Sequence, residues 1–181
     1  SNMNCNEILS NRASEIMGGK IGSKDPIHPN DHVNLGQSSN DVIPTAIHIA
    51  ANIMLEKELI PALQKMADRL DKKASEFSDI IKTGRTHLQD ATPITLGQEF
   101  SGYAQMVKNG IQRIQNSQSF LSELAQGGTA VGTGINTNYK FGSLMAMEIS
   151  LHTGITFHEA PNHFEAQGAQ DASVETSGTL K

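Results

Sequence analysis

The stretch VIPTAIHIAANIML, residues 42–55, decides the fold class, because nearly every position in it is apolar or small. A helix on a protein surface would carry more charge, so this stretch predicts a helix that is buried on most sides. Its one titratable side chain, His48, is expected to be a hydrogen-bonded core residue. Pro44 falls in the first turn, where a missing N–H does no harm, so we expect Asn40 or Asp41 to cap the helix.

Working outward, most of the remaining chain also has helical spacing. Residues 4–17 are expected to form an amphipathic helix with Ile8, Leu9, Ala13, Ile16 and Met17 on one face. Residues 61–77 give a second amphipathic stripe, and residues 162–181 are compatible with a helix. Thr95 and Gln98 form a capping box that opens a long helix. Residues 80–93 lack helical period and are expected to be extended or looped, so the predicted fold is all-α, a bundle of long helices.

Composition excludes several classes of partner and site. The 181 residues carry a net charge of -5 without a dense basic run, so neither nucleic acid nor an anionic membrane is an expected partner. One cysteine excludes an internal disulfide and a multi-thiolate metal site. No apolar run is long enough to span a bilayer.

A polar loop precedes the buried helix and is the first candidate site. Ser38, Ser39 and Asn40 bring hydroxyl, amide and backbone N–H donors to the positive end of a helix dipole. This arrangement suits a carboxylate or a phosphate. The same residue types are also the preferred helix caps, so the pattern alone fits either a ligand site or a structural cap.

A second loop, residues 83–93, contains Thr86 and His87. Thr86 can bond a ligand oxygen, and His87 can transfer a proton near neutral pH. The alternative is a histidine that is hydrogen-bonded in the core.

A third, glycine-rich loop at residues 127–134 lacks the Gly-Lys-Ser/Thr ending of a phosphate loop, so we interpret it as a turn between helices with backbone N–H groups near a ligand. Pro29 opposes helix between His28 and His32, and no metal site is expected there.

Four motifs occur in order along nearly the whole chain: His28-Pro29-Asn30-Asp31, Ser38-Ser39-Asn40-Asp41 followed by Pro44-Thr45-Ala46, Gly84-Arg85-Thr86-His87-Leu88-Gln89-Asp90-Ala91-Thr92-Pro93, and Gly127-Gly128-Thr129-Ala130-Val131-Gly132-Thr133-Gly134. Together they closely resemble the class II fumarate hydratases of the aspartase/fumarase superfamily. The resemblance implies a cofactor-free, metal-free lyase of the tricarboxylic acid cycle that reversibly adds water to fumarate to give L-malate.

Site residues follow from the resemblance at matching positions. His87 matches the catalytic histidine, which acts as proton donor or acceptor. Ser38, Ser39, Asn40 and Thr86 match substrate-binding positions. His28, Pro29, Asn30 and Asp31 match a second, peripheral dicarboxylate site.

The resemblance also implies how the chain is organised. Residues 1–37 correspond to the tail of the N-terminal domain and residues 38–181 to the first part of a truncated central helical domain. The family forms homotetramers whose active sites take loops from several subunits, in the bacterial cytoplasm or the mitochondrial matrix. The family's Gly-Ser-Ser-x-Met-Pro-x-Lys-x-Asn-Pro loop, with a second catalytic residue, does not occur, so we expect an internal fragment that is inactive by itself.

Two alternatives stay open. An aspartate ammonia-lyase, or another lyase of the superfamily, is the nearer one. Aspartases usually carry Gln at the position of His87 and Thr at that of Ser39, and both residues here favour a fumarase. The alternative from another class is a non-catalytic helical scaffold for oligomerisation.

Overall fold

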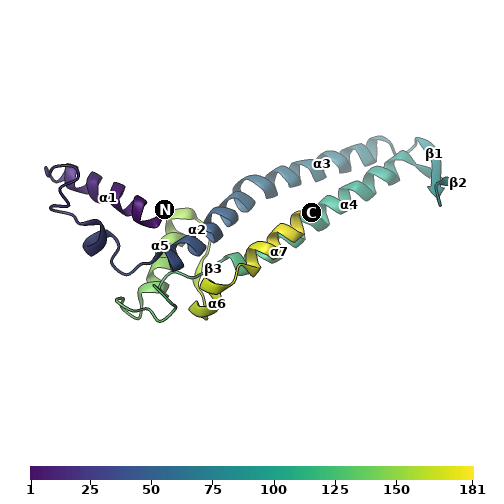
Figure 1. Cartoon of the computed structure of the whole chain (residues 1–181). Coiled ribbons are helices and arrows are strands. Elements are labelled where there is room, and N and C mark those ends of the chain that lie inside the picture. Colours follow the sequence, from purple (N-terminus) through teal and green to yellow (C-terminus); the bar gives the residue numbers. More distant parts are fainter. The chain divides into compact units, whose positions relative to one another are not determined.

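The computed structural model describes residues 1–181 and divides the chain into two compact units. The first unit comprises residues 1–52 and 119–174, and the second comprises residues 53–118 and 175–181. Figure 1 shows the order of the elements. The helices are α1 (Asn2–Ile16), η1 (Pro29–Val33), α2 (Ser39–Met54), η2 (Leu55–Leu59), α3 (Ile60–Glu76), α4 (Leu96–Leu121), α5 (Phe141–Thr153), α6 (His163–Gly168) and α7 (Asp171–Leu180). The strands are β1 (Ile81–Thr86), β2 (Gln89–Thr95), β3 (Glu123–Leu124) and β4 (His158–Glu159).

In the second unit, α3 and α4 run side by side in opposite directions, and the β1–β2 hairpin joins their ends (Figure 1). Close to the hairpin, the rings of Phe77 and Phe100 meet edge to face with their centroids 5.3 Å apart. Farther along the pair, Lys108 Nζ lies 2.7 Å from the Asp71 carboxylate. The two helices therefore contact each other at two levels below the hairpin.

The hairpin and its junction with α4 have the local structure that the sequence predicts. Thr86 pairs with Gln89 across a two-residue turn, so residues 80–93 are extended as expected. The capping box is also confirmed: Gln98 Oε1 accepts the Thr95 N–H at 2.9 Å, and Thr95 Oγ1 accepts the Gln98 N–H at 3.1 Å. These bonds satisfy donors that the first turn of a helix leaves unpaired.

The first unit has a small apolar core where the end of α4 continues into β3. Leu124, Ala146 and Phe157 are buried together, and partly buried isoleucines from α2 and α5 pack against them. β3 and β4 form a short parallel ladder at this core. With two short sheets among nine helical segments, the prediction of an all-α helical fold is confirmed.

Helix α2 is buried through polar side chains, which differs from the sequence-based expectation. Its inward positions, spaced three or four residues apart, are Asp41, Thr45, His48 and Asn52. His48 Nδ1 donates to the Glu123 carbonyl at 2.8 Å, so its prediction as a bonded core residue is confirmed. The expectation of burial on most sides is wrong, because Ile43 and Ile47 are 38% and 43% exposed. Segment 122–129 offers hydrogen-bond partners, and polar side chains need such partners when they are buried.

Helix α1 is also buried through polar side chains, while its apolar side chains are exposed. Its buried face is Asn2, Asn6, Ser10 and Ser14. Asn6 Nδ2 donates to Asn34 Oδ1 at 2.8 Å, and Ser10 Oγ donates to the Ile27 carbonyl at 2.6 Å. The apolar face that the sequence predicts is exposed, with Ile8 and Ile16 at 63% and 71%. Within the single chain, the connection that follows α1 covers its polar face and leaves the apolar stripe open.

No helix of the chain has both the length and the apolar character needed to cross a membrane.

Candidate functional site

The loop at the start of α2 carries the first group of predicted site residues. Ser38 is partly buried, whereas Ser39 and Asn40 are exposed. Ser38 Oγ accepts the N–H of Asn40 at 3.3 Å, so Ser38 caps the helix and not Asn40 or Asp41. The side chains of Ser39 and Asn40 are therefore not needed as caps, and they are presented at the positive end of the α2 dipole.

Asp41, behind this loop, is fully buried and connects it to the glycine-rich loop. Its Oδ1 accepts the backbone N–H of Ser38 at 2.8 Å. Its Oδ2 accepts the backbone N–H groups of Thr129 and Gly127 at 2.9 and 3.3 Å, and Nε2 of Gln126 at 3.2 Å. A single carboxylate thus receives donors from both sequence-predicted loops, and such charge-assisted bonds are stronger than neutral ones.

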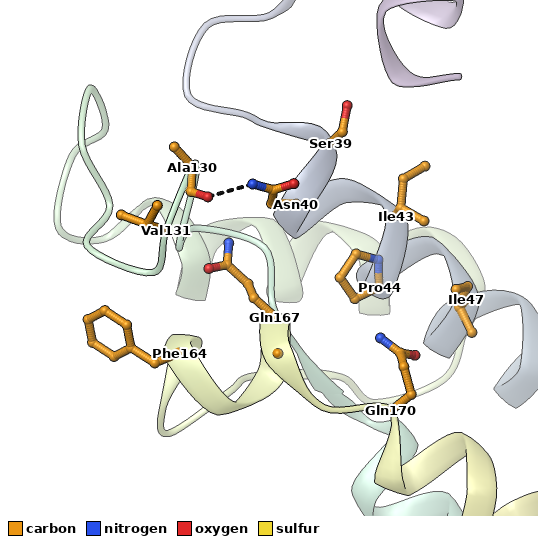
Figure 2. Close-up of a pocket in the computed structure, with 11 residues that line it drawn as sticks. Ser39, Asn40, Ile43, Pro44, Ile47, Ala130, Val131, Phe164, Gln167 and Gln170 are labelled. Atoms are coloured by element: carbon orange, nitrogen blue, oxygen red, sulfur yellow. Dashed lines mark hydrogen bonds between the residues drawn. The ribbon is translucent and has the colours of Figure 1, made fainter.

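The same two loops meet again at Asn40 (Figure 2). Asn40 Nδ2 donates to the Ala130 carbonyl at 2.7 Å. From α6, Gln167 Nε2 donates to the carbonyl of Thr129 at 2.6 Å. The expectation that the backbone N–H groups of the glycine-rich loop face a ligand needs correcting for Gly127 and Thr129, because these two face Asp41.

Two cavities open beside Ser39. One, of about 520 Å³, has Ser39 and Asn40 at its rim, Ile43 and Ile47 along α2, and Phe164 from α6 (Figure 2). The other, of about 360 Å³, has a mixed lining, with apolar side chains such as Met3 and Ile135 beside the polar residues Asn34, Gln37, Ser38, Ser39 and Asn136. Neither lining includes a Lys or Arg side chain. Neutral donors and the helix dipole are therefore what the linings of these two cavities offer to an anion.

The tip of the hairpin carries the second group of predicted site residues. His87 and Leu88 form the two-residue turn, with φ angles of 51° and 62°. Positive φ at both central positions defines a type I′ turn, which favours Asn and Gly over His and Leu. Thr86 and His87 are exposed, and Leu88 is 100% exposed. No packing interaction of Leu88 offsets the strain, and strained backbone of this kind concentrates at functional sites.

The predicted peripheral site lies at η1. Pro29 is buried, and His28 Nδ1 accepts the backbone N–H groups of Asn30 and Asp31, each at 3.3 Å. The Asp31 carboxylate lies 3.4 Å from the same ring nitrogen. The backbone N–H of His28 donates to His32 Nδ1 at 2.8 Å. Both histidines thus use a ring nitrogen within the turn.

A comparison with known proteins gives the family. The family model described as Lyase matches residues 1–181. The chain belongs to this lyase family. The lyase chain is 61% identical over 180 residues to a protein of Saccharomyces cerevisiae named mitochondrial fumarate hydratase. The aligned region covers 99% of the chain and 37% of that protein. It is 57% identical over 180 residues to the class II fumarate hydratase of Caulobacter vibrioides, covering 99% of the chain and 39% of that protein.

A solved structure gives the same assignment for the fold. The recombinant class II fumarase from Schistosoma mansoni superposes on the lyase chain with a TM-score of 0.93 at 39% identity, covering 99% of the chain and 40% of that structure. The resemblance to class II fumarate hydratases drawn from the motifs is thereby confirmed. The chain spans well under half the length of the curated relatives that it matches.

Within the lyase chain, the predicted site residues fall into different units. Ser38, Ser39 and Asn40 belong to the first unit, and so does the His28 turn. Thr86 and His87 belong to the second. No three His, Cys, Asp or Glu side chains are grouped so that they could hold a metal ion.

Sequence reasoning missed the role of Asp41 and of its partner Gln126. An aspartate two residues into a helix has the pattern of an ordinary cap, and nothing in its spacing points to a loop 88 positions away. The available signal was indirect. A charged residue at the start of a nearly uncharged helix has to be paired when it is buried.

Proposed function

We propose that the enzyme built from subunits containing this lyase chain catalyses the reversible hydration of fumarate to L-malate, a step of the tricarboxylic acid cycle. The observation that carries the proposal is the 61% identity over 180 residues to a protein named fumarate hydratase. In the forward direction, hydroxide adds to one carbon of the double bond and a proton to the other. In the reverse direction, a proton leaves the carbon beside a carboxylate, and that carboxylate takes up the negative charge. The C–O bond of the neighbouring carbon then breaks, which releases hydroxide and forms the double bond.

Ser38, Ser39 and Asn40 bind a carboxylate of the substrate in this proposal, together with Thr86. The transition state carries more negative charge on that carboxylate than the substrate does. Donors that are already oriented toward it stabilise the transition state without reorganising. The exposed side chains of Ser39 and Asn40 at the α2 N-terminus fit this role, because neither serves as the helix cap.

His87 acts on the proton, directly or through a water molecule. An imidazole titrates near neutral pH, so it can take and return a proton in the same cycle. The place of His87 at an exposed, strained turn supports a functional role over a structural one. A histidine needed only for structure would not be held at the tip of a hairpin with positive φ.

Several copies of the chain contribute to each active site, and the enzyme is a homotetramer. The exposed apolar side chains of α1 and α2 support such an assembly, because large apolar side chains left exposed on a helix face are typical of an interaction site. In this proposal residues 1–37 correspond to the end of the N-terminal domain of the relatives and residues 38–181 to the first part of the central domain. The turn formed by His28, Pro29, Asn30 and Asp31 is a second dicarboxylate site, where Asn30 has an exposed side chain.

The proposed location in the cell is based on the names and organisms of the relatives. The Saccharomyces cerevisiae relative is named mitochondrial, and the Caulobacter vibrioides relative is bacterial. We propose that the enzyme works in the mitochondrial matrix or the bacterial cytoplasm.

The test measures the loss of the ultraviolet absorbance of fumarate with the full-length enzyme and its His87→Asn variant. Asparagine tolerates positive φ, so this substitution keeps the turn and removes only the titratable group. Turnover should fall by about a hundredfold, a usual size for losing acid/base catalysis. His152→Asn, which makes the same change at an exposed histidine of α5, is the matched control and should keep wild-type turnover.

Three results would contradict the proposal. Near-normal turnover in His87→Asn would remove His87 from the mechanism. A wild-type enzyme that consumes aspartate and releases ammonia, without hydrating fumarate, would make it an aspartate ammonia-lyase. Inactivity of the assembled enzyme toward both substrates would favour a helical scaffold.

A further inference from the structure

We propose that Asp41 is a positioning residue that holds the substrate-binding loop Ser38–Asn40 against the glycine-rich loop at residues 127–134. This inference rests on the proposed function, since it concerns the loop that binds the substrate carboxylate. Asp41 itself does not contact substrate, because its side chain is completely buried.

The geometry of Asp41 supports a connection between the two loops. One carboxylate oxygen accepts the N–H of Ser38 at 2.8 Å, the residue that caps α2. The other accepts from Thr129 and Gly127 at 2.9 and 3.3 Å, and from Gln126 Nε2 at 3.2 Å. The two oxygens therefore serve different loops, and moving either loop would leave a buried charge with fewer donors.

The path from Asp41 to the substrate side of the loop is short. Ser38 is bonded to Asp41 through its N–H and bonds Asn40 N–H through its hydroxyl. Asn40 is also tied to the glycine-rich loop by its side-chain amide, 2.7 Å from the Ala130 carbonyl. Loss of the Asp41 bonds would leave Asn40 Nδ2 as the remaining direct hydrogen bond between these loops among the contacts described above.

Charge distinguishes positioning from a direct electrostatic role. A carboxylate close behind the loop repels a dianionic substrate, so by charge alone its removal should tighten substrate binding. A positioning role predicts the opposite sign. Without its anchor the loop spreads over several geometries, and a misplacement of about 1 Å is enough to lower catalysis by about a hundredfold.

The experiment compares Asp41→Asn with wild type in the full-length enzyme. The amide has nearly the same shape as the carboxylate, but it lacks the charge and turns an NH₂ group toward N–H donors. We expect KM for fumarate to rise, and kcat/KM to fall by about a hundredfold. Hydrogen exchange of the backbone amides of Ser38, Gly127 and Thr129 should become faster in the same variant.

A matched control comes from the same helix. His48→Ala removes another buried polar contact of α2, the bond to the Glu123 carbonyl, without touching either loop. It should lower the free energy of unfolding and leave KM and the exchange of Gly127 and Thr129 unchanged.

Gln126→Leu provides a milder variant if Asp41→Asn does not fold. It removes one donor to Asp41 and should lower kcat/KM about threefold to tenfold, the loss of one hydrogen bond.

The outcomes separate this inference from the proposed function. If wild-type enzyme does not hydrate fumarate, the proposed function fails, and the exchange of Ser38, Gly127 and Thr129 still decides whether Asp41 joins the loops. If wild type is active, a lower or unchanged KM in Asp41→Asn overturns the positioning role. The same holds if Gln126→Leu affects kcat/KM no more than His48→Ala does.

Discussion

The loop at Ser38–Asn40 and the hairpin tip at His87 both carry candidate site residues, and they are held in place by different interactions. The loop is fixed by a buried carboxylate that reaches residues as far as 88 positions along the chain. The tip is fixed by a two-residue turn whose backbone is strained and whose side chains are exposed. Substitutions at the first should therefore change stability strongly, and substitutions at the second should change it weakly or in the favourable direction.

The largest expected effect is at Asp41. Replacing it by Asn should lower the free energy of unfolding by about 3 to 5 kcal/mol, because several buried N–H donors lose a charged acceptor at about 1 to 3 kcal/mol each. Urea denaturation followed by circular dichroism would measure this. Asp68→Asn, at an exposed carboxylate of α3 that accepts from Gln64, is the matched control and should change stability by less than about 1 kcal/mol. A small effect at Asp41 would mean that the loop is held mainly by other contacts.

Gly97, in the first turn of α4, tests how firmly the base of the hairpin is held. A Cβ at this position would overlap the Ala74 carbonyl oxygen and lie 2.9 Å from the Ser78 Cα. Gly97→Ala should therefore destabilise the α3–α4 pair by about 1 to 3 kcal/mol. Gly110→Ala in the same helix meets nothing within 4 Å and should stabilise it by about 0.5 to 1 kcal/mol. Equal thermal shifts in the two variants would show that α3 and α4 are not closely packed at Gly97.

Leu88 tests the strain at the tip. Leu88→Gly should raise the free energy of unfolding by about 0.5 to 1 kcal/mol, because relief of the left-handed strain exceeds the entropy that glycine adds to the unfolded chain. Leu88→Ala keeps the strain and removes no buried contact, so it should be nearly neutral. Thermal unfolding of the pair would measure the difference. A destabilised glycine variant would indicate that Leu88 is packed in the assembled enzyme.

The smallest effect concerns pH. The Lys82 ammonium, 2.7 Å from the Glu99 carboxylate, and the Tyr103 hydroxyl hold the pKa of Glu99 below its usual range. A lowered pKa means that the stabilisation is present above the unfolded-state pKa and is lost as the pH falls through the folded-state pKa. Lys82→Met should move the pKa of Glu99 upward, which a carboxyl NMR titration would detect. An unchanged titration would show that the bond to Lys82 does not persist in solution.

Much of the fold could be predicted from local pattern. The capping box at Thr95 and Gln98 places the start of α4, and the loss of helical period marks the hairpin. The inward faces of α1 and α2 could not be predicted in this way. Apolar periodicity identifies a buried face only when the core is apolar. Here the partners of both helices are backbone N–H and carbonyl groups and polar side chains.

The candidate site could be predicted from sequence as a set of residue types, but not as a geometry. Ser38 to Asn40 and His87 are candidates because they lie in loops with residues that a helical bundle does not need, and because they match positions in the motifs of the family. Asp41 was missed because its partners are set by tertiary structure. The turn type at His87 was also missed, since His-Leu is not a sequence that favours positive φ.

The polar inner face of α2 also sets the position of the helix along its own axis. Apolar contacts constrain a helix along its axis less sharply than hydrogen bonds do, because dispersion has little directionality. The bonds of Asp41 and His48 do not survive a slide, since a shift of one turn, about 5.4 Å, would carry every donor and acceptor past its partner. Helix α2 therefore has one permitted register against segment 122–129. That register also fixes the position of the loop at the N-terminus of α2.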